Sequence, residues 1–231
     1  MAGVTVTWLG HGSFRIDSPE GKRIYLDPWL EGNPRIPESE LQPERCDIIA
    51  ITHGHFDHVA AVGQLSEAFS PPIVAIHELG QYFDAQGIPG GADHAMGMGG
   101  TQTIQDISFT LVRSVHSSST PDGAYAGEAG GFVIKFENGT TVYASGDTDV
   151  HSDMALIKQL HAPETAILSI GDHYTMGPKG ARLALELLGV TRCIPGHWGT
   201  FPVLHGAPTA LRELAPDVDI ADLEPGDAVT V

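Results

Sequence analysis

The stretch from residue 48 to residue 58 reads Ile-Ile-Ala-Ile-Thr-His-Gly-His-Phe-Asp-His. Its Ile-rich apolar run predicts a buried β-strand. The strand is followed within six residues by four candidate metal ligands, His53, His55, Asp57 and His58. We expect them on a loop whose tight point is Gly54. Four ligands this close are too many for one ion to use easily, so the spacing favours two adjacent ions over a surface histidine cluster.

The composition limits the class of protein. The chain has 231 residues, of which 42% are hydrophobic, which predicts a single domain over residues 1–231 with a substantial core. Its formal net charge of -17 repels polyanions, so we expect a small-molecule substrate and neither long nucleic acid nor a membrane as partner. Cys46 and Cys193 form no C-x-x-C pair and are expected to be packing residues. No signal peptide or membrane-spanning run is visible in the sequence, which predicts a cytoplasmic protein; a homo-oligomer is left open.

Strands and strand–helix units recur once in each half of the chain. In the first half we expect strands over 4–9, 14–16, 23–26, 48–51 and 73–76, helices over 59–69 and 77–86, and a glycine-rich loop over 87–100. In the second half we expect strands over 107–115, 132–136, 140–145, 166–170 and 192–194, and helices over 152–161, 178–188 and 207–214. The polar stretch 117–131 is expected to be a mobile loop over the site. Two such halves with their sheets face to face predict an α/β fold with four layers, an αββα sandwich.

Potential ligands repeatedly follow the predicted strands. The residues that share this position are His11, Asp27, His53, His116, Asp147, Asp172 and His197. Any one of them alone would be an ordinary capping or core residue. Because strand ends can gather at one edge of a sandwich, their repetition predicts a single site there.

The candidate ligands form two sets joined by one carboxylate. We predict His53, His55 and His116 for one ion, Asp57, His58 and His197 for the other, and Asp147 as the bridge. Each ion would keep a position for water, which is typical of catalytic rather than structural sites. Imidazole and carboxylate ligands suit zinc, with manganese or iron as alternatives, better than calcium or magnesium. Two such ions can share a hydroxide and polarise a substrate oxygen.

At these residues the sequence resembles the metallo-β-lactamase superfamily. The resemblance rests on His53-Gly-His55-Phe-Asp57-His58, His116, Asp147 in Ser-Gly-Asp-Thr, and His197 in Pro-Gly-His-Trp-Gly-Thr-Phe. Residues 8–13, 26–29 and 175–178 further resemble its small stand-alone metal-dependent hydrolases. That branch is similar to the ascorbate-6-phosphate lactonases and, more distantly, to the N-acyl-phosphatidylethanolamine phospholipases D. The resemblance implies the αββα sandwich and the same division of ligands, and His55 matches the hydrolases rather than the diiron relatives, which carry Glu there.

Five further residues receive predicted roles in or beside the site. Asp27 is expected to orient a ligand imidazole. His11 is expected to contact substrate, and His173, where the branch carries Asn, to donate to a leaving group, to contact metal or only to pack. Asp172 and Thr175 are expected to support the metal centre or the substrate.

The sequence therefore predicts a dinuclear metal-dependent hydrolase whose metal-bound hydroxide attacks a small ester, lactone or phosphoester. In this hypothesis Asp57 orients the nucleophile and takes its proton. A nucleotide or nucleic-acid phosphodiesterase with the same metals is the first alternative. A non-enzymatic metal-binding protein with a closed coordination shell is the second.

Overall fold

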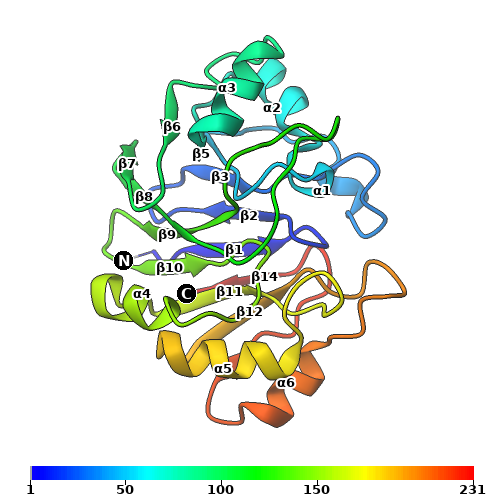
Figure 1. The fold of residues 1–231 in the computed structure, drawn as a ribbon, viewed down its shortest axis with the longest axis vertical. Helices are drawn as coiled ribbons and strands as arrows, with labels where there is room; N and C mark the ends of the chain where they lie inside the picture. Colours follow the sequence, from blue (N-terminus) through cyan, green and yellow to red (C-terminus); the bar gives the residue numbers. More distant parts are fainter. Residues whose placement is uncertain (1) are drawn as a thin grey trace.

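Two seven-stranded sheets lie face to face in the computed structural model, which describes residues 2–231 (Figure 1). The first sheet has the order β14-β1-β2-β3-β4-β5-β6, and the second has the order β13-β12-β11-β10-β9-β8-β7. The strands of the first sheet are β1 (Thr5–Trp8), β2 (Phe14–Asp17), β3 (Arg23–Leu26), β4 (Ile48–Ala50), β5 (Ile73–Ile76), β6 (His94–Met96) and β14 (Ala228–Thr230). Those of the second are β7 (Thr101–Ile104), β8 (Ile107–Arg113), β9 (Gly130–Lys135), β10 (Thr141–Ala144), β11 (Thr165–Ser169), β12 (Arg192–Gly196) and β13 (Asp219–Ile220).

Helices cover the outer face of each sheet. The helices α2 (Val62–Phe69) and α3 (His77–Ala85) lie on the first sheet, and α4 (Met154–His161), α5 (Pro178–Leu188) and α6 (Pro208–Leu214) lie on the second (Figure 1). Two shorter elements are the 3-10 helix η1 (Glu38–Glu40) and the one-turn helix α1 (Phe56–Val59). The predicted four-layer αββα sandwich is confirmed.

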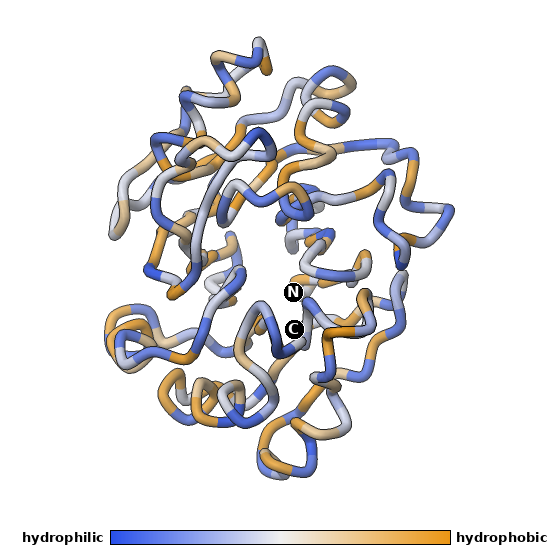
Figure 2. The backbone as a smooth tube through the Cα atoms, turned by 45° about the vertical axis from the view of Figure 1, so that its right-hand side comes forward, coloured by the Kyte–Doolittle hydropathy of each residue, from blue (hydrophilic) through white to orange (hydrophobic). Residues whose placement is uncertain are grey.

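Apolar periodicity explains how the layers hold together. In α5 the buried residues are Ala181, Ala184, Leu185 and Leu188, which form a stripe at helical spacing, and Figure 2 shows this alternation of hydropathy along the helices. They belong to an apolar cluster between the second sheet and its helices. A second, larger cluster contains side chains from both sheets and fills the space between them. Among residues 2–231, every helix is too short or too polar to span a bilayer.

The strand directions explain why the candidate ligands meet. Strands β1 and β3 both run antiparallel to β2, and β4 runs parallel to β3. In the second sheet β8 and β10 both run antiparallel to β9, while β11 and β12 run parallel to β10. Within each sheet, therefore, all strands that precede a candidate ligand end at the same edge, as the repeated strand-end pattern predicted.

The prediction that one loop and then one helix follow β4 is wrong in detail. Residues Phe56–Val59 form the separate helix α1, so Asp57 and His58 stand on a helical turn, and α2 begins only at Val62. Gly54 is needed for close approach and not for a tight turn. A Cβ at this position would lie 2.8 Å from the carbonyl oxygen of Ser119 and 2.6 Å from the Cβ of Ala126.

Two strands at the sheet edges were missed. The expected loop 87–100 contains β6, which pairs in parallel with β5, and β7 pairs with β8 although the sequence indicated no strand there. Both strands are short, and β7 is largely exposed, so neither carries the continuous apolar run by which buried strands are identified. The polar loop is also shorter than expected, because β9 begins at Gly130.

Substitution of Gly171 tests how closely the backbone packs at the edge of the sheets where the candidate ligands lie. A Cβ there would lie 2.0 Å from the carbonyl oxygen of His197, so Gly171→Ala must displace that backbone. We expect the free energy of unfolding to fall by about 2 kcal/mol, measured by urea denaturation. Gly63→Ala is the control, because its Cβ meets nothing within 4 Å and Ala favours the helix α2. Equal stability of the two variants would contradict this account.

Candidate metal centre

The first group of ligands is formed by three histidines from both sheets. His53 follows β4, His55 lies two residues later, and His116 follows β8. The Nε2 atom of His53 lies 3.0 Å from the Nδ1 atom of His55. Each of the three offers a ring nitrogen within 4.8 Å of the others. The structure thus brings together the set that the sequence assigned to one ion.

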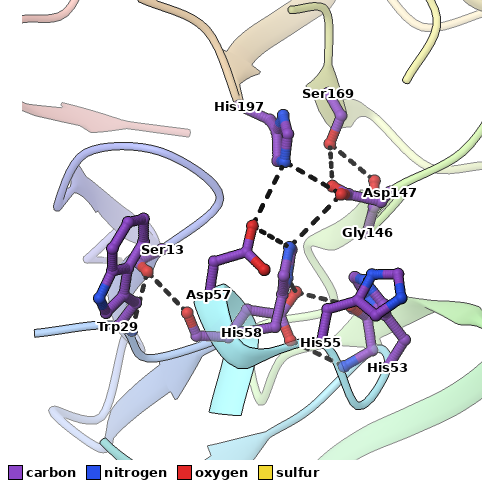
Figure 3. Close-up of polar contacts among 12 residues, drawn as sticks. Ser13, Trp29, His53, His55, Asp57, His58, Gly146, Asp147, Ser169 and His197 are labelled. Carbon is purple, nitrogen blue, oxygen red and sulfur yellow. Dashed lines mark hydrogen bonds and ion pairs between the residues drawn. The ribbon is translucent and has the colours of Figure 1, made fainter. Parts of the chain in front are cut away.

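The second group is formed around Asp57. Its Oδ2 atom lies 3.7 Å from His58 Nε2 and 3.8 Å from His197 Nε2 (Figure 3). His11 joins this group, because its Nε2 lies 2.8 Å from the same carboxylate oxygen. His11 is completely buried, and its ring bonds to Asp57. It is also among the residues that line the cavity over the two groups, and the contact with substrate predicted from the sequence stays a prediction.

Asp147 stands between the two groups. Its Oδ2 atom lies 3.0 Å from His197 Nε2 and 3.4 Å from His58 Nε2, on one side, and 3.8 Å from His116 Nε2, on the other. Ser169 Oγ donates to the remaining oxygen, Oδ1, at 3.2 Å (Figure 3). One carboxylate oxygen therefore faces both ligand groups, which is the position predicted for a bridge.

The ligand geometry fits divalent metal ions. His58 Nε2 is buried without a hydrogen-bond partner among the described residues, although it faces the carboxylates of Asp57 and Asp147. An orphaned buried nitrogen is costly unless something satisfies it. The surrounding donors are imidazole nitrogens and carboxylate oxygens, the set that zinc, manganese and iron accept. A metal ion would satisfy His58 Nε2 and the neighbouring carboxylates together.

Asp27 orients one imidazole of each group. His58 Nδ1 donates to Asp27 Oδ2 at 2.9 Å, so Nε2 faces the centre and is the nitrogen that a metal ion would bind. Thr52 donates its N–H to Asp27 Oδ1 at 2.8 Å and its hydroxyl to Oδ2 at 2.6 Å. The same hydroxyl lies 3.1 Å from His53 Nδ1 and can accept its proton, which leaves His53 Nε2 facing His55 of its own group. Asp27 lies where the predicted orienting role requires it.

Three residues of the site have a left-handed backbone. The φ angles are 55° at His11, 48° at Asp27 and 55° at His197. This conformation is uncommon for residues other than glycine and costs about 1 kcal/mol or more at each position. Asp27 and His197 come directly after β3 and β12, and His11 lies three residues after the end of β1. The strained backbone bends the chain at the strand end and aims the side chain into the site.

Charge divides the histidines into two kinds. Burial opposes protonation of His58 and His197, but the Asp147 carboxylate outweighs it and raises the pKa of His197 to about 9 and that of His58 well above its ordinary value. For His53, His55 and His116, burial and neighbouring histidines lower the pKa. Burial also lowers the pKa of His11 to about 4, so this imidazole is neutral at pH 7.

A cavity of about 680 Å³ opens over both groups. Asp57, His116, Asp147 and His197 line it, and residues 117 and 119–121 contribute from the predicted loop. This loop is tied to the ligand segment, because the N–H of Gly54 donates to Ser118 Oγ at 3.2 Å.

Three residues predicted from the segment after β11 lie outside the cavity lining. His173 is exposed and packs its ring edge-on against Tyr174, with ring centroids 4.4 Å apart. Asp172 accepts only from the N–H of His173 among the contacts of its side chain, and Thr175 donates to the carbonyl of Met176. The left-handed backbone at Asp172 and His173 presents Tyr174 to the cavity instead. The site role expected for His173 therefore has no contact to support it.

The sequence also missed the apolar part of the lining. Phe56, Tyr174, Phe201 and Val203 line the cavity. Two of them were within motifs already singled out, since Phe56 lies between the ligands His55 and Asp57, and Phe201 ends the Pro-Gly-His-Trp-Gly-Thr-Phe segment. Their apolar side chains gave no indication of whether they would pack inward or line a cavity.

Replacement of Asp27 tests its orienting role. Asp27→Asn removes the charge that holds the Nδ1 proton of His58, so we expect zinc affinity to fall about 10- to 100-fold. Competition with a chromophoric chelator measures this. Asp106→Asn is a matched control, because Asp106 is an exposed residue of the β7–β8 turn. An unchanged zinc affinity in Asp27→Asn would refute the orienting role.

Metal binding is expected to release protons. In the metal-free protein His197, with a pKa of about 9, is protonated at pH 7, and a metal ion must displace that proton. Zinc affinity should therefore rise as pH increases from 6 toward 9. Calorimetric titration in buffers of different ionisation enthalpy measures the protons released. Affinity that stays constant between pH 6 and 8 would contradict the raised pKa.

Comparison with known proteins agrees with this geometry. The family model of the beta-lactamase superfamily domain matches residues 22–198. A UPF0173 metal-dependent hydrolase from Koribacter versatilis is 44% identical over 230 residues, which cover 98% of each chain. Another, from Herpetosiphon aurantiacus, is 44% identical over 238 residues, covering 100% of this chain and 99% of its own.

A solved structure has the same fold over the full length. Igni18, a metallo hydrolase from the hyperthermophilic archaeon Ignicoccus hospitalis, superposes with a TM-score of 0.86 at 29% identity, covering 99% of this chain and 98% of its own. The fold, the ligand groups and these relatives lead to one conclusion: the chain belongs to the beta-lactamase superfamily and is a metal-dependent hydrolase.

Proposed function

We propose that this protein is a dinuclear hydrolase that acts on a small ester, lactone or phosphoester. The observation that carries the proposal is the position of Asp147, whose single oxygen Oδ2 faces His116 of one ligand group and His58 and His197 of the other. In this proposal His53, His55 and His116 hold one ion, Asp57, His58 and His197 hold the second, and Asp147 bridges them. Zinc is the preferred metal, with manganese or iron as alternatives.

The ions would supply Lewis acidity, which lowers the pKa of water toward neutrality and polarises the scissile carbonyl or phosphoryl oxygen. The protein residues supply positioning. Asp57 lines the cavity, and its Oδ2 is held by His11. The other oxygen, Oδ1, has no side-chain partner among the described residues, so it can orient the attacking water by accepting a hydrogen bond from it. Burial opposes ionisation of Asp57, but His58, His11 and His197 hold its pKa well below its usual range, so this carboxylate is a weak acceptor of the proton itself.

His11 has the charge state that this role needs. Because its pKa is lowered to about 4 by burial, neutral His11 donates one hydrogen bond to Asp57 and adds no positive charge beside the metal site. Its main chain is held as well, since Trp8 Nε1 and the N–H of His197 both donate to the His11 carbonyl at 2.8 Å. We therefore assign His11 to positioning Asp57.

Metal analysis and hydrolysis together test the proposal. We expect about two zinc ions per chain in the unaltered protein and about one in His55→Ala and in His197→Ala, since each variant removes a ligand from a different group. Hydrolysis of p-nitrophenyl acetate or bis(p-nitrophenyl) phosphate should fall on the order of 100-fold or more in both variants.

His161→Ala is the matched control, because His161 ends α4 on the outer face of the second sheet. It should retain both ions and full activity. The proposal fails if the unaltered protein binds less than one ion tightly, or if the two ligand variants hydrolyse both substrates as fast as the control.

A further inference from the structure

The side chains that line the cavity indicate which kind of substrate it binds, which the metal ligands alone do not. Phe56 and Tyr174 are 54% and 55% exposed, and Val203 is 37% exposed, although all three are large apolar side chains. All three line the cavity of about 680 Å³ above the ligand groups. Exposed apolar side chains concentrated in one cavity are typical of a site that buries an apolar group of its ligand.

One side of the cavity is an aromatic wall, formed by Phe56 and Phe201 with Trp29 behind them. The ring centroids of Trp29 and Phe56 are 5.4 Å apart, and those of Trp29 and Phe201 are 6.1 Å apart. Phe201 also packs edge-on against His11, with centroids 5.4 Å apart. Trp29 is only 5% exposed, so a buried side chain backs the wall.

Lysine and arginine side chains are absent from the lining of this cavity among residues 2–231. Apart from the histidines and the aspartates, its polar groups are the hydroxyls of Ser117, Ser119, Thr120 and Tyr174. Arg35, on a nearby loop, is held instead by the carbonyl of Gly199 and the carboxylate of Glu224. The whole chain carries a formal charge of -17, which adds a repulsive field for anions.

The metal ligands add little attraction for an anion. The carboxylates of Asp27, Asp57 and Asp147 lie within hydrogen-bond or ion-pair distance of His58. They would offset three of the four positive charges of two divalent ions. Arg and Lys are the side chains that bind phosphate by charge-assisted hydrogen bonds, and this cavity has neither among the described residues.

We infer that the substrate is an uncharged carboxylic ester with an apolar acyl chain, and not a phosphoester. This inference rests on the proposed function and selects among its substrates. In the reaction the oxygen of water forms a bond to the acyl carbon, and the bond from that carbon to the alcohol oxygen breaks. One proton of water goes to the alcohol, the other goes to solvent, and the acid leaves as its carboxylate. The aromatic wall, Tyr174 and Val203 hold the acyl chain.

The experiment compares substrates that all release the same leaving group, p-nitrophenol. We expect kcat/KM for p-nitrophenyl esters to rise about threefold per added methylene from acetate to hexanoate, as burial of each methylene in the cavity predicts. Bis(p-nitrophenyl) phosphate and p-nitrophenyl phosphate should be at least 100-fold poorer than the hexanoate. His116→Ala, measured alongside, gives the background rate of each ester.

Variants of Val203, a partly exposed residue of the lining, test whether the preference for longer acyl chains arises in the cavity. Val203→Lys places a cation in the lining and should reduce the preference for hexanoate over acetate at least about fivefold while improving hydrolysis of the phosphodiester. Val203→Leu keeps the apolar surface and should preserve the preference for hexanoate. Val203 is partly exposed, so both variants are expected to fold, and their melting temperatures check this.

Binding provides a readout that does not depend on turnover. Octanamide, which is uncharged, should bind the metal-loaded protein at least tenfold more tightly than octyl phosphate in calorimetric titration, and Val203→Lys should reverse this order. The inference is overturned if the unaltered protein binds octyl phosphate more tightly than octanamide, or if kcat/KM for the esters does not change with acyl chain length.

The two proposals fail in different ways. A protein that holds two ions and prefers the phosphodiester overturns only the substrate inference. A protein that holds no ions and hydrolyses nothing overturns the proposed function, and the binding comparison, repeated on that protein, still decides whether the cavity selects uncharged apolar ligands.

Discussion

The buried carboxylate of Asp27 is the interaction on which the geometry of the centre depends. It accepts directly from His58 Nδ1 and from both the N–H and the hydroxyl of Thr52, whose hydroxyl also lies beside His53 Nδ1. A buried carboxylate is stable only if its lone pairs are satisfied, and these contacts satisfy them. In return, they fix the ring orientation of one histidine in each ligand group. A single anion thus couples the two groups of candidate ligands.

The sheets provide the frame that makes this coupling possible. Asp27 follows β3 and Thr52 follows β4, neighbouring parallel strands, so the backbone ladder holds their spacing. Asp147 and His197 arrive from the second sheet at the same edge. The like-charged carboxylates and the crowded imidazoles remain close together because the packed apolar core between the sheets does not permit them to separate. A bound metal ion would replace the unfavourable contacts among these side chains with metal–ligand bonds, so the strain held in the metal-free site would fall.

Much of this arrangement could be predicted because it depends on local pattern. The Ile-rich run before His53 indicates a buried strand, and the repeated occurrence of a potential ligand after such runs indicates a common edge. The pattern could not show that Asp57 and His58 stand on the helix α1, because one helical turn is too short to have a periodicity. It could not show β6 and β7 either, since these short strands owe their existence to pairing with neighbours that are distant in the chain. His173 was given a site role because the family that the sequence resembles carries Asn there, at the border of its pocket, yet the left-handed backbone exposes the ring of His173 and presents Tyr174.

The sequence by itself indicated the four-layer fold and the candidate ligands, because apolar runs predict strands and the ligands follow those runs, and its motifs resemble those of the superfamily. Only the tertiary structure decided which ligands face one another, that His11 bonds to Asp57, and that the cavity is apolar and free of Lys and Arg among the described residues. The physical reason is that ligand chemistry is a property of single side chains. The lining of a cavity instead depends on which side chains from α1 and from the loops after β8, β11 and β12 are left unburied once the sheets have packed.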